Sequence, residues 1–432
     1  MGRELFSSRW GTALALIGVA VGLGNVWRFP YMMGLFGGGA FLVLYLVIVA
    51  VFGVPALMAE LALGRHTRRG PLTAFAEAGL PAGRFLGGVL YFGVAMAMSY
   101  YLVVVGWILA YVLIALGNLL GLMDDFGPQT FSRLQAQWPV QVLCAALVAM
   151  ACAEVVGRGV RVGIERVSRV FVPLFGVLML LLVARSLTLP GAMEGVVYLL
   201  SPDWGAITPR AVLAAMGQAF FSLGLGGTFF VIYASYLPDR GSLRRRAFTT
   251  AGGDVAASLL AGLAIMPAVF ATGLSPDSGP ALLFEVVPAA CAAMPGGLVF
   301  AFVFFVGLGS VAFLSGVAAV EVLVGSLTDT LGWPRRRTAW ILCAGLVVLG
   351  LPATLSLDYL FRSDLIWGST MQPAGSVVAL AALTWGLGRK KTLSQFTDED
   401  GNLPRWANAW FFWVRYVVPL AVITALVSGW IL

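Results

Sequence analysis

The chain has 432 residues, of which 60% are hydrophobic and only 11% charged, and its formal net charge is +7. A soluble domain carries roughly twice this share of charged residues, so the composition excludes a secreted, disordered or nucleic-acid-binding globule. The basic residues lie in short clusters between apolar segments, which indicates a protein that crosses a membrane several times.

Eleven segments have the roughly 20 mainly apolar residues that one membrane-spanning helix needs. In chain order they cover about 10–34, 39–63, 85–120, 139–156, 164–187, 209–236, 245–273, 297–330, 337–354, 363–387 and 407–431. The stretch Gly279–Pro295 is apolar but short, and three prolines interrupt it, so we expect a helical hairpin on one face. The sequence thus predicts an all-α polytopic membrane protein that forms a single transmembrane domain over residues 1–432.

The basic residues predict how the spans are oriented. If the spans alternate in direction from a cytoplasmic N-terminus, most of the 27 arginines and lysines fall in cytoplasmic segments. The few that remain on the outer side are Arg28, Arg133, Arg185, Arg210 and Arg362. Because cytoplasmic loops carry an excess of these residues, we expect a multi-pass protein of the inner (plasma) membrane with a cytoplasmic N-terminus and an extracytoplasmic C-terminus.

Two predicted spans contain clusters of glycine. The first span has glycines at 18, 22 and 24, and the sixth has glycines at 224, 226 and 227. Either cluster alone fits close helix packing, but two clusters in spans five apart favour broken helices in two inverted repeats. The five-helix repeats would cover spans 1–5 (about 10–187) and 6–10 (about 209–387), followed by an extra helix at about 407–431. Broken helices free backbone groups at mid-membrane that bind anions and cations such as Na⁺.

Motifs from the first span to the tenth resemble the neurotransmitter:sodium symporter family. They are Ser8-Arg9-Trp10-Gly11, Gly22-Leu23-Gly24-Asn25-Val26-Trp27-Arg28-Phe29-Pro30-Tyr31, Gly37-Gly38-Gly39-Ala40-Phe41, Glu60-Leu61-Ala62-Leu63-Gly64-Arg65, Tyr100-Tyr101, Gly163-Ile164-Glu165-Arg166, Gln218-Ala219-Phe220-Phe221-Ser222-Leu223 and Tyr233-Ala234-Ser235-Tyr236. Eleven spans resemble the bacterial branch, which includes transporters of leucine, tryptophan and other hydrophobic amino acids. The resemblance implies sodium-coupled symport by alternating access.

The resemblance also implies two sodium sites. The first takes oxygen atoms from Ala20, Asn25, Ser222 and Asp254, together with the substrate carboxylate. Many relatives have asparagine where this chain has Asp254, and a carboxylate within a span indicates function. The positions that hold chloride in animal members are polar here as well: Tyr45, Gln218, Ser222 and Ser258. Since Asp254 supplies a fixed negative charge, we expect transport that does not need chloride.

The second implied sodium site departs from the family pattern. It would use carbonyls of Gly18, Val21 and Val311 and the hydroxyl of Ser315. Leu314 stands where relatives usually have threonine or aspartate, which removes one ligand oxygen. An alternative alignment uses Ser310 instead. The number of coupled sodium ions, one or two, therefore stays open.

The implied substrate site suits a zwitterion with a large side chain. Gly22 stands where monoamine transporters carry an aspartate, so the substrate would bring its own carboxylate. The residues expected to contact the substrate are Ala20, Leu23, Gly24, Ala97, Tyr101, Phe221, Ser222, Gly224, Gly227, Ser315 and Ala319. Several of them are glycine or alanine, and a large apolar cavity favours a bulky hydrophobic or aromatic amino acid.

Gates are implied on both sides of this site. On the outer side, Arg28 and Asp364 resemble an ion pair above the aromatic lid. On the inner side, the matching residues are Arg3, Asp329 and Tyr236. Such pairs are individually modest in energy and therefore suit a switch between two states.

A membrane enzyme is the main rival from another class of protein. It would need a nucleophile–base pair, a metal cluster or a nucleotide loop. With one histidine, no Cys/His cluster and no phosphate-binding loop, we expect no enzyme and no organic cofactor. The expected partners are one or two sodium ions, an amino acid and the lipid bilayer, not nucleic acid. A transporter-like amino-acid sensor and a symporter for another zwitterionic substrate remain alternatives.

Overall fold

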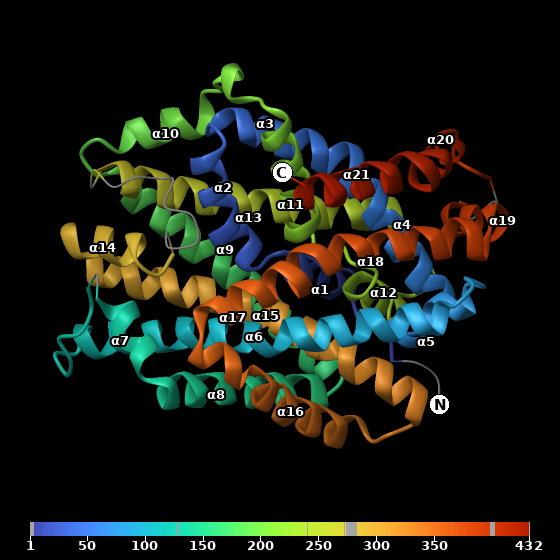
Figure 1. Cartoon of the computed structure of the whole chain (residues 1–432), viewed down its shortest axis with the longest axis horizontal. Coiled ribbons are helices and arrows are strands. Elements are labelled where there is room, and N and C mark those ends of the chain that lie inside the picture. Colours follow the sequence, from blue (N-terminus) through green and yellow to red (C-terminus); the bar gives the residue numbers. More distant parts are fainter. Residues whose placement is uncertain are drawn as a thin grey trace.

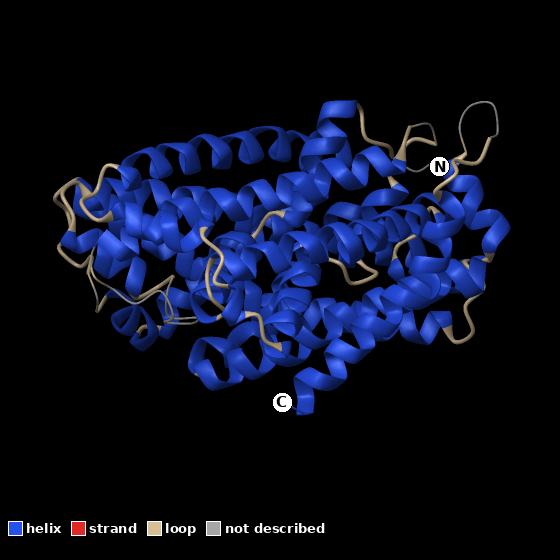
Figure 2. Cartoon of the chain, turned by 90° about the horizontal axis from the view of Figure 1, so that it is seen from above, coloured by secondary structure: helices blue, strands red, loops and turns tan. Residues whose placement is uncertain are grey.

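The long helices lie side by side along one direction of the molecule (Figure 1). This computed structural model describes residues 4–127, 129–239, 241–271, 273, 283–397 and 402–431. Within these ranges the chain consists of helices and the loops that join them, as the view from above shows (Figure 2). The all-helical expectation is confirmed for this part of the chain.

The helices of the first half follow the predicted apolar segments. They are α1 (Arg9–Ala20), η1 (Gly24–Arg28), α2 (Phe29–Leu35), α3 (Gly39–Ile48), η2 (Val49–Gly53), α4 (Val54–Thr67), α5 (Pro71–Glu77), α6 (Gly83–Leu119), α7 (Thr130–Ala136), α8 (Trp138–Gly157), η3 (Val160–Glu165), α9 (Arg166–Leu187) and α10 (Ala192–Leu200).

The second half is built in the same way. Its helices are η4 (Trp204–Ala206), α11 (Pro209–Ser222), α12 (Phe229–Ser235), α13 (Leu243–Ala271), α14 (Val286–Ala293), α15 (Gly297–Leu331), α16 (Arg335–Leu355), α17 (Leu357–Ser363), η6 (Asp364–Thr370), α18 (Met371–Ala381), η7 (Ala382–Leu387), α19 (Arg389–Leu393), η8 (Ser394–Phe396), α20 (Ala407–Phe412), η9 (Trp413–Val417) and α21 (Val418–Ile431).

Eight helical stretches in the described ranges are long and apolar enough to cross a membrane, or nine if the bent pair at the start of the chain is one span. The eight are Gly39–Thr67, Gly83–Leu119, Trp138–Gly157, Val160–Leu187, Leu243–Ala271, Gly297–Leu331, Arg335–Leu355 and Ala407–Ser428. The predicted sixth span is divided into helices of 14 and 7 residues, each too short to cross alone. The predicted tenth is the helical run 357–387, which is not among the eight.

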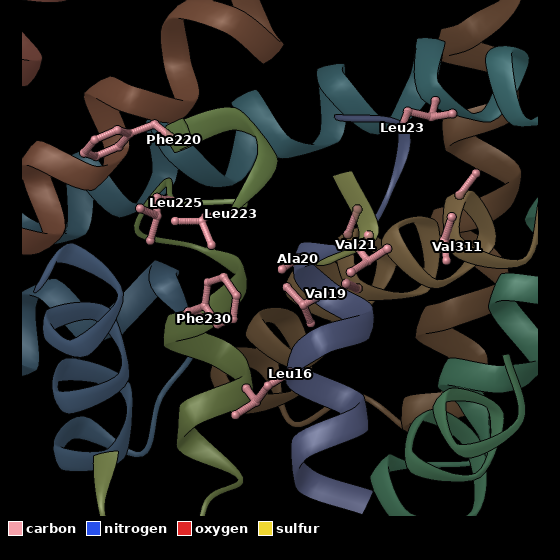
Figure 3. Close-up of a cluster of buried hydrophobic side chains, with 14 of the residues drawn as sticks. Leu16, Val19, Ala20, Val21, Leu23, Phe220, Leu223, Leu225, Phe230 and Val311 are labelled. Atoms are coloured by element: carbon pink, nitrogen blue, oxygen red, sulfur yellow. The ribbon is translucent and has the colours of Figure 1, made fainter. Parts of the chain in front are cut away.

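Two helices break near the centre of the molecule. The first bends by 52° between Ala20 and Gly24. The second break separates Ser222 from Phe229, and the glycines at 224 and 227 have φ angles of 66° and 67°. Glycine adopts such left-handed backbone without the penalty that a Cβ atom brings. The two predicted interruptions are therefore present, and Figure 3 shows the apolar side chains around them, including Val19, Val21, Leu223 and Leu225.

The bundle packs around α1 and the second break. The helix α1 contacts α9, α13 and α15, while α15 also packs against α6, α8 and α16. The short helix α14 packs on α15 and α13. It lies in the stretch Gly279–Pro295, which was expected to form a helical hairpin. Residues 279–282 of that stretch lie outside the described residues, so the hairpin as a whole stays a prediction.

Candidate ion- and substrate-binding site

A buried cluster of polar side chains surrounds Asp254 on α13. Asn25 Nδ2 lies 2.6 Å from Asp254 Oδ1, and Ser222 Oγ donates to the same carboxylate at 2.7 Å. Tyr45 donates its hydroxyl to Asp254 Oδ2 at 2.7 Å, and Ser258 Oγ lies 2.9 Å from Asn25 Nδ2. All five side chains are at most 2% exposed. The structure therefore brings together, at one point, three predicted sodium ligands and three predicted chloride-site residues.

The two broken helices and α13 position this cluster. Asn25 follows the first break, and its Oδ1 accepts the Gly22 N–H at 2.8 Å. Gln218 lies one helical turn before Ser222 on α11 and donates to the Gly24 carbonyl at 2.8 Å. The hydrogen bond from Gln218 joins one broken helix to the other. The cluster therefore depends on the relative position of the two breaks.

The carboxylate of Asp254 has no arginine or lysine partner in the part of the chain that the structure describes. An ionised group taken out of water costs several kcal/mol unless hydrogen bonds or an opposite charge compensate it. Three side chains donate to Asp254, but all of them are neutral. The arrangement therefore leaves a net negative charge that a small cation would neutralise.

A cavity of about 190 Å³ adjoins the cluster. Ten of the eleven predicted substrate-binding residues line it: Ala20, Leu23, Gly24, Ala97, Tyr101, Phe221, Ser222, Gly224, Ser315 and Ala319. Gly227 is the exception, because its N–H donates to Glu60 Oε1 at 2.9 Å. Gly226 lines the cavity instead. Of these two glycines, the structure places Gly226 at the cavity, where Gly227 was expected.

The cavity also contains residues that sequence reasoning missed. They lie mainly on the helical run 357–387 and on α12: Thr228, Phe229, Trp367, Met371 and Gln372. Gln372 was detectable as a polar residue within a mainly apolar segment. The aromatic and methionine side chains carry no such signal, because they look like ordinary core residues.

The two polar side chains predicted to face the substrate from α6 and α15 are engaged with backbone carbonyls. Tyr101 donates to the Ala312 carbonyl at 3.1 Å, and Ser315 donates to the Val21 carbonyl at 3.3 Å. A Cβ atom on Gly22 would lie 2.4 Å from Ser315 Oγ. A side chain at position 22 would therefore require the Ser315 hydroxyl to move.

The residues of the predicted second sodium site meet at the same break but offer few side-chain oxygens. Val21 and Ser315 are joined by the hydrogen bond just described. Leu314 packs against Gly18, with its Cδ1 only 3.1 Å from where a Cβ of that glycine would lie. Val311 is fully buried on the same helix, α15. The departure at Leu314 is thus a hydrocarbon placed directly against a predicted ligand residue.

The predicted outer gate residues line the cavity but are not joined directly. The Arg28 guanidinium lies over the Phe221 ring at 4.6 Å and donates to Ser369 Oγ at 3.4 Å. Asp364 accepts from the Tyr100 hydroxyl at 3.0 Å. Among the described residues, no ion pair links Arg28 to Asp364. The predicted gate pair is therefore not closed in this structure.

At the predicted inner gate, a buried acid, Glu321, connects α15 to α16 and to Tyr236 at the end of α12. Tyr236 donates its hydroxyl to Glu321, and Arg335 forms an ion pair with the same carboxylate. Asp329 accepts from the Gly70 N–H at 3.3 Å. Arg3, the remaining predicted gate residue, lies outside the described residues. The partnership of Glu321 with Arg335 was missed, because residues 14 positions apart share no helical motif.

The sequence of the chain is similar to those of sodium-dependent transporters. Residues 3–124 and 130–429 match the sodium:neurotransmitter symporter family. A Bacillus subtilis protein named an uncharacterized sodium-dependent transporter is 36% identical over 434 residues, which cover 97% of this chain and 96% of that protein. A similarly named protein of Methanocaldococcus jannaschii is 30% identical over 449 residues, which cover 99% and 90%.

The fold has a counterpart among solved structures. The crystal structure of MhsT in complex with L-phenylalanine has a TM-score of 0.88 and is 34% identical, with 99% of this chain and 100% of that chain covered. The family and its named members are transporters, not enzymes. The chain is therefore an integral multi-pass membrane transporter that belongs to the sodium:neurotransmitter symporter family.

Proposed function

We propose that this protein is a sodium-coupled symporter of a bulky hydrophobic or aromatic L-amino acid and that it transports without chloride. The single observation that carries the proposal is the buried Asp254 carboxylate, which lies beside the cavity and is bonded only to neutral donors. A sodium ion bound there gains an anionic ligand from the protein itself. Chloride then has no charge left to supply.

The substrate's charged groups would be bound at the breaks. A zwitterion offers a carboxylate, which suits the first sodium and the free backbone of Leu23 and Gly24. Its amine suits the carbonyl groups of Ala20, Phe221 and Ser222. Gly22 supports this assignment, since it supplies no protein carboxylate to bind an amine at this position.

The substrate's side chain would occupy the apolar part of the cavity. Ala97, Gly224 and Ala319 leave this part wide, while Phe221 and Tyr101 supply aromatic surface. Burying an aromatic side chain of roughly 150–250 Å² contributes about 4–6 kcal/mol before the costs of binding. The likeness to the phenylalanine complex of MhsT supports the same substrate class.

The sodium ligands are assigned in two groups. Ala20, Asn25, Ser222 and Asp254 would hold the first ion, and Gly18, Val21, Val311 and Ser315 a weaker second one. The hydrocarbon of Leu314 beside Gly18 supports the view that coupling rests mainly on the first ion. No organic cofactor is required for this cycle.

Alternating access would use eleven spans in two inverted repeats, with the N-terminus in the cytoplasm and the extra helix at the C-terminus outside. In this scheme Arg28 and Asp364 close above the substrate. Arg3, Asp329 and Tyr236 open below it. The two breaks at similar positions in α1 and the α11–α12 pair support the repeat.

The experiment is uptake into proteoliposomes after a thermal-stability screen of the twenty amino acids with and without sodium. A ligand that binds the folded state raises the melting temperature, so stabilisation that requires sodium identifies the substrate. We then expect sodium-driven accumulation of tryptophan, phenylalanine, tyrosine or leucine above the external concentration. Binding without accumulation would indicate a sensor instead. Stabilisation by glycine but not by larger amino acids would contradict the proposed substrate class.

A matched pair of variants sharpens the assignment of the cavity. Ala319→Leu fills the space beside Ser315, so we expect tryptophan uptake to fall about tenfold while uptake of smaller amino acids persists. Ala318→Leu on the same helix is the control, because this residue is fully buried but does not line the cavity. Equal loss of large and small substrates in Ala319→Leu would count against the assignment.

A further inference from the structure

A half-buried arginine, Arg415, lies within the last candidate membrane-spanning helix, next to exposed side chains. The span Ala407–Ser428 has 22 residues, and Arg415 is eight residues from its start, or about 12 Å along the axis. The neighbouring Phe412 and Tyr416 are 58% and 48% exposed. A charge at this depth is costly and marks a functional site unless something compensates it.

The protein itself supplies aromatic rings to this charge but no acid. The Arg415 guanidinium lies 5.3 Å from the Trp385 ring, 5.3 Å from the Tyr416 ring and 5.9 Å from the Phe411 ring. No carboxylate pairs with it in the part of the chain that the structure describes, and its buried Nε has no hydrogen-bond partner. Cation–π contacts orient the group but do not neutralise its charge.

Two distorted helical turns create this arrangement. Trp385 belongs to η7 and Arg415 to η9, and these two π-helical segments pack against each other. Turns of this kind are rare and occur frequently at functional sites. Because the two segments lie next to each other, the Trp385 ring and the Arg415 guanidinium lie in one shallow crease between the helices. We call it the η7–η9 crease, after residues 382–387 and 413–417.

More positive charge lies at the basic end of the crease. Arg389 donates to Asn408 Oδ1 at 2.9 Å, and Lys390 and Lys391 beside it are exposed. Asn408 precedes Arg415 by seven residues, so both lie on one face of the helix about 10 Å apart. Helical side chains lean toward the helix N-terminus, which directs Arg415 toward this basic end.

We propose that the η7–η9 crease binds the phosphate of an anionic phospholipid, with Arg415 as the principal ligand. Phospholipid phosphates lie at the membrane surface, toward which the long Arg415 side chain can extend, and their negative charge complements an uncompensated guanidinium. The exposed rings of Trp385 and Tyr416 would pack against the glycerol and upper acyl chain, as aromatic residues do at membrane interfaces. The proposal is independent of the sodium-coupled cycle.

The test measures retained lipid by native mass spectrometry. The full chain is placed in nanodiscs of phosphatidylcholine and phosphatidylglycerol at 4:1 and released in the gas phase. We expect Arg415→Gln to retain at least threefold less phosphatidylglycerol than the wild type, and Arg415→Lys an intermediate amount. Arg166→Gln removes an exposed arginine from the start of α9 and should retain the wild-type amount. Retention by Arg415→Gln equal to that of the wild type, or equal losses in Arg415→Gln and Arg166→Gln, overturns the proposal.

A measurement on the wild type keeps the proposal testable if Arg415→Gln does not fold. Hydrogen–deuterium exchange is compared in detergent with added dihexanoyl-phosphatidylglycerol, dihexanoyl-phosphatidylcholine or inorganic phosphate. We expect protection of residues 382–393 and 402–417 by phosphatidylglycerol alone. Equal protection by inorganic phosphate would mean a free anion site, and equal protection by phosphatidylcholine would mean no selectivity for charge. Either result, or no protection at all, overturns the proposal.

Discussion

The two predicted sodium sites share the break after α1 but are built from different chemistry. Around the first, Asp254, Asn25, Ser222 and Tyr45 form a continuous buried network of side-chain hydrogen bonds. Around the second, Ser315 is the one side-chain oxygen of the predicted set, and it bonds to the Val21 carbonyl. One site carries its own charge, whereas the other depends on backbone carbonyls next to a leucine.

This difference indicates where the coupling energy is concentrated. A buried charge that has only neutral partners interacts strongly with a bound cation, because the low dielectric surroundings screen it little. Backbone carbonyls also bind cations, but each contributes a dipole rather than a full charge. The first site should therefore dominate the response to sodium.

The largest expected effect follows from removing the charge at the first site. Asp254→Asn keeps the size of the side chain, but a sodium ion then lacks its anionic protein ligand. We expect sodium-driven uptake in chloride-free medium to fall at least 100-fold. Part of the loss should return with chloride, since Tyr45, Gln218 and Ser258 provide polar groups beside the vacated charge.

The control for this variant is Asp358→Asn, which alters an exposed carboxylate paired with Arg362. It should transport at the wild-type rate, because exposed ion pairs contribute little. If Asp254→Asn took up substrate at the wild-type rate without chloride, this would contradict the expectation that the first sodium site contributes more to coupling than the second.

The next effect tests the second site by adding an oxygen. Leu314→Thr places a hydroxyl next to Gly18, and Leu314→Val matches its shape without the hydroxyl. We expect the Hill coefficient for sodium-dependent uptake to rise toward 2 in Leu314→Thr only, with a three- to tenfold gain in apparent sodium affinity. Both variants lose packing atoms, so their stabilities should fall alike. A rise in the Hill coefficient of Leu314→Val would refute the oxygen argument.

A smaller effect is expected from the acid that holds the second break. Glu60 is fully buried and accepts the Gly227 N–H at 2.9 Å. Glu60→Gln weakens a charge-assisted hydrogen bond, which contributes about 1–2 kcal/mol more than a neutral one. We expect about tenfold slower uptake and an apparent melting temperature lower by roughly 1–2 °C. Sodium affinity should change little, because Glu60 lies outside the Asp254 cluster, and a large change there would contradict this separation.

The smallest effect is expected at Ser315. Ser315→Ala removes the one predicted side-chain ligand of the second site, yet we expect the half-saturating sodium concentration to rise less than threefold. Ser222→Ala is its counterpart in the first site and should raise that concentration at least tenfold, since Ser222 donates directly to Asp254. The reverse order in sodium titrations of uptake would place the dominant ion at the second site.

The features that the sequence predicted well are those set by local composition or by a dense motif. The apolar segments predicted the helices, and the glycine clusters predicted both breaks. The motif residues around Asn25 and Ser222 do converge on Asp254. Residues of one motif next to a break lie on the same short piece of helix and are positioned together. Such a motif therefore predicts which side chains lie near each other as well as the helix itself.

The features that were missed depend on how distant helices are rotated. Gly226 lines the cavity whereas the neighbouring Gly227 does not, and sequence spacing does not determine this difference. The ion pair between Glu321 and Arg335 depends on the packing of α15 against α16. The sequence therefore predicts where each helix lies along the chain. It does not predict which residues of neighbouring helices face each other.

In the proposed cycle, Asp254 supplies the negative charge at the principal sodium site. The most direct measurement compares initial rates of amino-acid uptake by wild-type proteoliposomes in sodium chloride and in sodium gluconate, at the same sodium gradient. We expect equal rates within about twofold, because Asp254 replaces the charge that chloride would bring. Loss of uptake in gluconate that returns when chloride is added would contradict it.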